Sequence, residues 1–306
     1  MKDKIGKVVF LGIALIVFSG WVNSPTALIL GFAFTLLFNN PFKAYCHKAI
    51  HTFLKVSVVG LGFGMFLNET LETSKEGFTL TLFSILLTVS LGFLLTRVLK
   101  LDTKLGHLIT SGTSVCGGSA IAAISPIINA KSKIISVALA VVFLLNSVAL
   151  FVFPAIGHYL NLTQEQFGLW CAVAIHDTSS VVGAAIGYGD EALRIATTVK
   201  LSRMLWIIPL SLFSMFVFKT KGEKIKMPYF ILLFVGAILL NSYHLVPAPA
   251  TGFLVATSKH LLVLTLFLVG STISIADLKK TGAKPMVLAV SLWVFISVLS
   301  LGYILY

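Results

Sequence analysis

The chain has 306 residues, of which 57% are hydrophobic and only 11% are charged, and its mean hydropathy is +0.99. This composition indicates an integral membrane protein with many spans and excludes a soluble globular protein. The net charge of +12 would suggest a nucleic-acid partner in a soluble protein. Because the basic residues lie in short loops between apolar runs, we interpret the charge as a sign of membrane orientation and expect no nucleic-acid partner.

Apolar runs of about 20 residues mark the predicted membrane spans. The N-terminal run follows three lysines and resembles a signal sequence, but a retained first helix agrees better with the rest of the topology. We expect one transmembrane domain over residues 1–306. Nine runs are predicted to cross the membrane fully: residues 8–21, 25–38, 49–67, 78–98, 134–153, 192–218, 229–245, 252–275 and 285–306.

Two further runs are apolar at both ends but are interrupted by small polar residues. The first, residues 105–128, contains Gly112, Gly117 and Gly118, each of which destabilises a continuous helix by up to about 1 kcal/mol relative to alanine. The second, residues 167–188, contains the sequence HDTSSVVGAA. Lipid cannot satisfy opened backbone, and transporters build substrate sites from pairs of interrupted helices. Close helix packing is the alternative explanation for the small residues.

The two interrupted segments share a weak repeat. At an offset of 65 residues, the first segment places Thr113-Ser114, Gly118 and Ala120-Ile121 on the second segment's Thr178-Ser179, Gly183 and Ala185-Ile186. The repeat predicts that the two segments are related structural elements.

Lysine and arginine in short loops predict the orientation. A cytoplasmic N-terminus places the basic loops inside and Glu69, Glu72 and Glu76 outside. Lys131 and Lys133 also lie inside if the first interrupted segment enters and leaves by one face. The second segment is then a hairpin that enters from the opposite face. The prediction is an all-α polytopic fold with inverted repeats and two broken or re-entrant helices.

Two cations are predicted to lie near the membrane midplane. Lys200 and Arg203 are three residues apart and share one helix face. A cation at that depth costs roughly 2.5–3.5 kcal/mol on insertion scales, so each needs an internal partner. Two interpretations stay open, namely a structural ion pair with Asp177 and an anion site. His176 and Asp177 are the predicted ion-coupling residues, although Asp177 before Thr178 is also typical of a helix N-cap.

The predicted substrate-binding residues come from both interruptions and from the basic pair. They are Thr113, Ser114, Cys116, Gly117, Gly118, Ser119, Thr178, Ser179, Ser180, Lys200 and Arg203. No hydrolase triad is recognisable, and GTSVCGG lacks the lysine of a phosphate-binding loop, so we do not expect an enzyme. We expect no cofactor and no metal site, with Na+ or H+ as the coupling ion.

Three segments of the chain resemble the YeiH-like family of bacterial inner-membrane proteins, which are described as sulfate exporters. The similar residues are 112–128 (GTSVCGGSAIAAISPII), 176–185 (HDTSSVVGAA) and 197–206 (TTVKLSRMLW), and the resemblance extends over nearly the whole chain. It implies an inverted-repeat transporter of the sodium/proton antiporter and bile-acid symporter type. It also implies a small sulfur-containing or carboxylate anion as substrate.

Together these features predict a multi-pass transporter in the bacterial inner membrane, with a cytoplasmic N-terminus. We expect a secondary active exporter of a small inorganic or organic anion, such as sulfate or a sulfonate, that is driven by an ion gradient through alternating access. A cation/proton antiporter with Asp177 as carrier is the first alternative, and an uncoupled channel is the second. The expected partners are the anion and membrane lipids, and the sequence leaves a homodimer open.

Overall fold

The computed structural model describes residues 2–38, 40–219, 229–272 and 282–306. Within these ranges all regular structure is helical. Five described helices or helix pairs contain a stretch that is long and apolar enough to cross a membrane. In an 18-residue window of each stretch only 28% to 39% of the residues are buried, so more than half of each window is at least partly exposed, as expected for helices that contact lipid. The stretches are Gly77–Val98, Lys133–Tyr159, Asp190–Phe218, Ala248–Thr272 and Ala283–Leu305.

The count of full spans differs from the nine that the sequence predicts. A sixth span is added if the bent pair Lys48–Gly62 and Leu67–Thr73 counts as one. Helices α1 (Lys2–Phe18), α2 (Ser24–Phe38) and α12 (Tyr229–Ser242) are apolar but have 17, 15 and 14 residues. They are therefore shorter than the roughly 20 residues that a perpendicular span needs.

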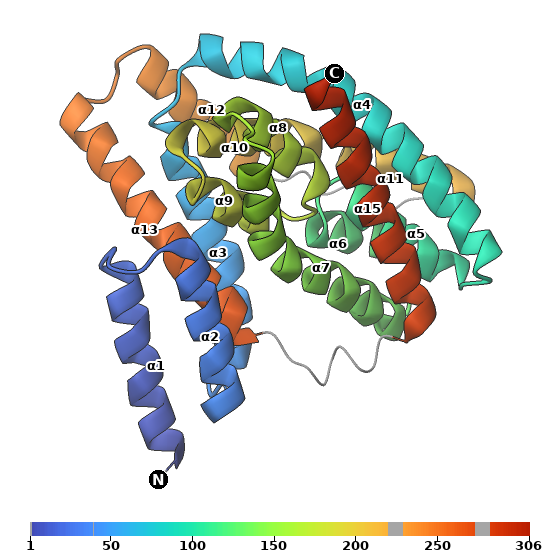
Figure 1. Cartoon of the computed structure of the whole chain (residues 1–306), viewed down its shortest axis with the longest axis horizontal. Coiled ribbons are helices and arrows are strands. Elements are labelled where there is room, and N and C mark those ends of the chain that lie inside the picture. The colour runs from blue at the N-terminus through green and yellow to red at the C-terminus, as the bar shows by residue number, and fades with distance from the viewer. Residues whose placement is uncertain (1, 39, 220–228, 273–281) are drawn as a thin grey trace.

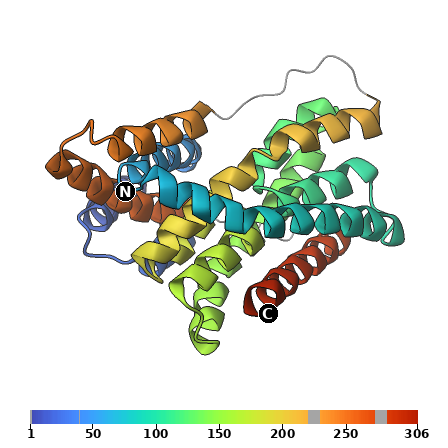
Figure 2. The ribbon, with the colours of Figure 1, turned by 90° about the horizontal axis from the view of Figure 1, so that it is seen from above.

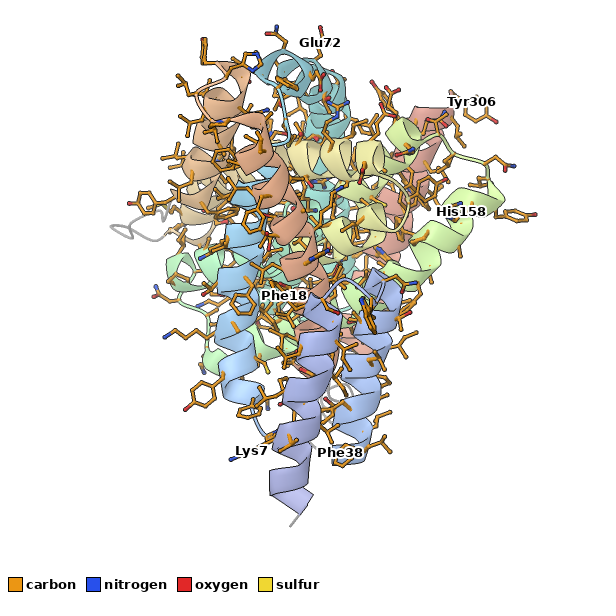
Figure 3. The ribbon with its side chains drawn as sticks, turned by 90° about the vertical axis from the view of Figure 1, so that its left-hand side faces the viewer. Lys7, Phe18, Phe38, Glu72, His158 and Tyr306 are labelled. Carbon is orange, nitrogen blue, oxygen red and sulfur yellow. The ribbon has the colours of Figure 1, made fainter. Side chains whose placement is uncertain are left out.

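The acidic stretch that we expected to form an outer loop is helical. Helix α4 runs from Leu67 to Val98, so Glu69, Glu72 and Glu76 lie in its first turns. Carboxylates near a helix N-terminus interact favourably with the helix dipole, which explains why an acidic stretch can begin a helix. Figure 3 shows Glu72 and Tyr306 at one end of the molecule and Lys7 and Phe38 at the other. Glu72 and Lys7 thus lie at opposite ends of the molecule.

The helices form two groups that lie side by side (Figures 1 and 2). One group contains α1, α2, α12, α3 (Lys43–Gly62) and α13 (Ala248–Thr272). Its helices approach closely where α2 crosses α13. A methyl group added to Gly31 would collide with the Phe267 carbonyl oxygen, and one added to Gly270 would collide with the Leu28 carbonyl oxygen. Small residues at such crossings allow membrane helices to pack backbone against backbone.

The second group contains α4 to α11 and α15 (Ala283–Leu305). Here α4 crosses α5 (Thr103–Ser114) through a reciprocal pair of contacts. A methyl group on Gly92 of α4 would collide with the Thr110 side chain, and one on Gly106 of α5 would collide with the Thr96 side chain. Both helices carry the same pattern, LGFLLT in α4 and LGHLIT in α5. The long helix α4 therefore holds the first arm of the interrupted segment at a fixed crossing point.

Candidate functional site

The first interrupted segment is a re-entrant hairpin. Helix α5 ends at Ser114, and α6 (Gly118–Ile127) begins after residues 115–117. Lys104 Nζ, in the first turn of α5, donates a hydrogen bond to the carbonyl oxygen of Asn129, just after α6, over 2.9 Å. A continuous helix would place these residues more than about 30 Å apart at 1.5 Å per residue. The chain therefore enters and leaves on one side of the molecule, as Lys131 and Lys133 led us to predict.

The second interrupted segment has the same form. Helix α8 (Gln164–Ala174) and α9 (Thr178–Ile186) are separated by residues 175–177. Tyr188 Oη, after α9, donates to the carbonyl oxygen of Leu162, before α8, over 2.7 Å. Gln164 Oε1 also accepts from the backbone N–H of Glu191 at 3.1 Å. The two ends of this hairpin are therefore adjacent as well.

The two hairpins enter from opposite ends of one helix. Helix α7 (Ser132–Tyr159) follows the first hairpin directly and ends just before the second. Its 28 residues span about 42 Å at 1.5 Å per residue. The bases of the hairpins are thus separated by the length of a membrane-spanning helix, and each hairpin points back toward the middle of the molecule.

The tips of the hairpins, residues 115–117 and 175–177, meet there. Gly117 has a φ of +61°, a conformation that suits glycine. A Cβ on Gly117 would lie 3.2 Å from Asp177 Cβ and 3.3 Å from the carbonyl carbon of His176. One tip therefore rests directly on the other, and a side chain at position 117 would require the second tip to shift by a few tenths of an ångström.

The offset of 65 residues at which we aligned the two interrupted segments differs by five from the spacing of the helix breaks. The two breaks correspond at an offset of 60, which pairs Gly117 with Asp177, and not at 65. Thr113 lies in the last turn of the helix before the first break, whereas Thr178 begins the helix after the second. The reason is that similar short polar residues suit both ends of a broken helix, so matching letters does not locate the break.

Helix α10 (Asp190–Met204) contacts both tips with two buried cations. Lys200 Nζ donates to the carbonyl oxygens of Ala172 at 3.2 Å and Ile175 at 2.6 Å. Arg203 Nε and Nη2 both donate to the carbonyl oxygen of Ser114, at 3.1 and 2.5 Å. These carbonyls lie at the C-terminal ends of α8 and α5, where helix carbonyls lack partners and the dipole is negative. One face of α10 thus caps both broken helices, and both side chains are fully buried.

The ion pair that we considered between Lys200 and Asp177 does not form. The salt bridges between described residues do not include either side chain. Ser179 Oγ donates to the Asp177 carboxylate instead. Lys200 bonds to carbonyl oxygens because the end of α8 presents several of them that no backbone N–H can reach.

Several buried polar atoms at the tips lack a hydrogen-bond partner within the described residues. They include Arg203 Nη1, both ring nitrogens of His176, Asp177 Oδ1 and the side-chain nitrogen of Asn146. Asn146 is buried in α7, and its Oδ1 accepts from the backbone N–H of His176 at 3.1 Å. Our sequence reasoning missed Asn146, although a lone asparagine in an otherwise apolar helix is a signal for an interhelical hydrogen bond. These groups keep hydrogen-bonding capacity that a water molecule, an ion or a ligand could satisfy.

All the site residues predicted from the sequence lie at the tips, in the adjoining half-helices or on α10. Ser119 is exposed, Gly118 and Asp177 are partly exposed, and the remaining ones are buried. The buried ones are Thr113, Ser114, Cys116, Gly117, His176, Thr178, Ser179, Ser180, Lys200 and Arg203.

The charge at the tips is predominantly positive. Helices α6 and α9 both begin there, so two helix N-termini with free N–H groups converge. Asp177 precedes α9 and is the only carboxylate at the tips among the described residues, whereas Gly117 precedes α6 and offers no side chain. With Lys200 and Arg203 behind them, the tips form an environment that favours a small anion.

These features define a class of protein, namely a multi-pass membrane protein that is helical throughout its described regular structure and has two helical hairpins that meet tip to tip. The chain belongs to the UPF0324 family of membrane proteins. The family described as conserved hypothetical protein 698 matches residues 4–289, which agrees with the resemblance to YeiH-like proteins.

The relatives cover almost the whole chain. A UPF0324 membrane protein of Photobacterium profundum is 51% identical over 97% of this chain and 91% of its own length. A UPF0324 membrane protein of Shewanella oneidensis is 48% identical over 98% of this chain and 95% of its own length. The corresponding protein of Bacteroides thetaiotaomicron is 47% identical over 94% and 87%. No solved structure matches the chain.

Proposed function

We propose that the protein is a secondary active transporter that exports a small anion, such as sulfate or a sulfonate, across the bacterial inner membrane. The observation that carries the proposal is the meeting of the two hairpin tips midway between the ends of α7. Transporters use half-helix N-termini near the midplane to bind anionic groups, because such termini offer free N–H groups and positive partial charge.

The partners of the two buried cations favour an anion as the substrate. Lys200 and Arg203 neutralise the C-terminal ends of α8 and α5, which leaves the N-termini of α6 and α9 to face a ligand. Asp177 offsets the terminus of α9 only. The remaining N–H groups of Arg203 and the N-terminus of α6 can then hold oxyanion oxygens with charge-assisted hydrogen bonds.

Alternating access follows from how the two helix groups meet. Both tips are attached to α10, so the hairpins move as one body with that helix. The first group contacts the hairpins chiefly through α9, where a Cβ on Gly183 would lie 2.8 Å from Leu266 of α13. In this proposal the second group, which contains both hairpins, rocks against the first group as in an inverted-repeat transporter. An Na+ or H+ gradient drives the cycle.

A cation/proton antiporter is the second candidate, and one observation favours it. Asp177 is a partly exposed carboxylate at the tip, and its Oδ1 has no described partner. A carboxylate at membrane depth that can lose its hydroxyl partner Ser179 is suited to carry a proton or Na+.

Counterflow in proteoliposomes tests these alternatives. Liposomes with purified protein, preloaded with unlabelled sulfate, should accumulate labelled sulfate transiently and saturably, whereas an uncoupled channel only equilibrates it. Gly117→Ala should strongly reduce counterflow because a side chain strains the positive φ at this position and crowds Asp177 on the opposite tip. Gly236→Ala, on α12 with open space around it, is the matched control and should transport normally. Absence of counterflow with sulfate or methanesulfonate, together with Na+-dependent proton movement, would reject the anion transporter in favour of the antiporter.

A further inference from the structure

An ion pair joins the two helix groups where α13 passes the start of α10. Lys259 Nζ of α13 lies 2.5 Å from Asp190 Oδ1 of α10. The other ion pairs between described residues are those of Arg194 with Glu69 and Glu191, and both lie within the second group. The contact between Lys259 and Asp190 therefore crosses the seam, by which we mean the surface where α13 meets α9 and the start of α10.

The face of α13 that carries Lys259 continues along the seam toward the hairpin tips. Lys259, Leu262 and Leu266 are three and four residues apart and share one helix face. Leu266 lies 2.8 Å from the position of a Cβ on Gly183 of α9, and Gly183 comes seven residues before Asp190 just as Leu266 comes seven after Lys259. The two chain segments therefore run in opposite directions, and the ion pair lies about 10 Å further from the tips than Leu266 at 1.5 Å per residue. Figure 1 shows α13 beside α9.

A narrow gap in the seam continues to the second tip. It lies between Thr265 and Leu266 of α13 and Ser179 and Gly183 of α9. Ser179 is in the first turn of α9 and donates a hydrogen bond to the carboxylate of Asp177 at the tip. The gap has no room for a water molecule, so the seam is closed in this structure.

We propose that the seam is the route by which the anion reaches the tips from the side where the second hairpin has its base, and that the Lys259–Asp190 ion pair is the latch that holds this route closed. The anion rests on the proposed function, whereas the latch rests on the geometry alone. Asp190 begins the helix that also carries Lys200 and Arg203, so the latch connects α13 directly to the body that holds both tips. The paired side chains are 30% and 83% exposed, and such exposed ion pairs are weak enough to be released in each cycle.

Thiol labelling tests the latch without any transport measurement. The native cysteines are buried, so background reaction with a charged, membrane-impermeant maleimide should be low. The reporter is Thr265→Cys, exposed to the reagent from the side of the membrane that labels Glu72→Cys, and it should react slowly while Lys259 is intact. Lys259→Met should raise its rate about two- to fivefold, the change in the opening equilibrium that one exposed ion pair allows. Lys259→Glu should raise the rate further through repulsion from Asp190, and Lys259→Arg should keep it low.

Arg194→Met is the matched control, because it breaks ion pairs of the same helix that do not cross the seam. It should leave the labelling rate of Thr265→Cys unchanged. Added salt should speed labelling while Lys259 is intact but not in Lys259→Met, since salt screens exposed charges. Leu262→Cys, on the same face of α13, is the second reporter if Thr265→Cys folds poorly. Equal acceleration by Arg194→Met, rapid labelling with Lys259 intact, or no acceleration by either Lys259→Met or Lys259→Glu would overturn the latch.

Sulfate counterflow tests the route separately. Thr265→Cys combined with Lys259→Met should transport sulfate before labelling and stop after it, because the adduct fills the seam, whereas labelled Glu72→Cys should continue to transport. Counterflow that survives complete labelling of Thr265→Cys would reject the seam as the route. Absence of counterflow by the wild-type protein would instead reject the proposed function, and the anion route with it, while the labelling pattern of the latch would stand.

Discussion

Neutralising Lys200 and Asp177 singly and together distinguishes a helix cap from an ion pair. Lys200→Met leaves the carbonyl oxygens of Ala172 and Ile175 without their partner, at about 1–3 kcal/mol each. It also removes a cation from the membrane interior, which stabilises the folded protein by roughly 2.5–3.5 kcal/mol. The two effects largely offset each other, so we expect the free energy of unfolding to change by at most a few kcal/mol.

The decisive quantity is the coupling energy in the double-mutant cycle with Asp177→Asn. Losing one partner of a buried ion pair destabilises by about 3–5 kcal/mol, so a true pair would give a coupling of that size. Lys200 bonds to carbonyls and Asp177 bonds to Ser179, so we expect a coupling below about 1 kcal/mol. Equilibrium unfolding in mixed detergent micelles measures it, with the exposed Lys133→Met as the control for loss of charge alone. A coupling above about 2 kcal/mol would refute the capping role.

Three further predictions concern the tips and the first hairpin. Arg203→Lys should lower the free energy of unfolding by about 1–2 kcal/mol in the same assay, because an ammonium cannot reproduce the two hydrogen bonds that the guanidinium donates to the carbonyl oxygen of Ser114. An unchanged free energy of unfolding would mean that these two hydrogen bonds do not stabilise the fold. Gly117→Ala should destabilise by about 1–2 kcal/mol from its positive φ alone, and measured stability equal to the wild type would contradict that geometry. Lys131→Cys should react with an impermeant thiol reagent only from the cytoplasmic side, opposite to Glu72→Cys, and labelling of both from one side would contradict the hairpin.

Much of the hairpin geometry could be predicted because a break in a helix is a local property. Gly117 lies in the break between α5 and α6, Gly118 begins α6, and small polar residues flank both, whereas Gly112 remains helical within α5. Lys131 and Lys133 then indicate the side on which the first hairpin closes, since basic loops follow a simple rule of orientation. The proposed location of the site at the two breaks follows from the same reasoning.

The partners across helices could not be predicted in this way. Asp177 is the natural partner for Lys200 when only charges are considered, but the carbonyls at the end of α8 become its partners once the chain is folded. Asn146 likewise acquires its role only because α7 passes the second break. Such contacts depend on how helices pack, and the sequence of one helix does not record which surface of another it meets.

The arrangement of caps on α10 also limits leakage. Lys200 and Arg203 are separated by about 4.5 Å along one helix at 1.5 Å per residue, and between them they hold the C-terminal ends of both inward-pointing arms. The arms therefore share one support and cannot part while both caps hold. A continuous pore past the tips would have to break four charge-assisted hydrogen bonds, each of about 1.5–3 kcal/mol. If the protein is the transporter proposed above, thermal fluctuations would open such a pore only rarely, and α10 would help to keep the two sides of the membrane separate.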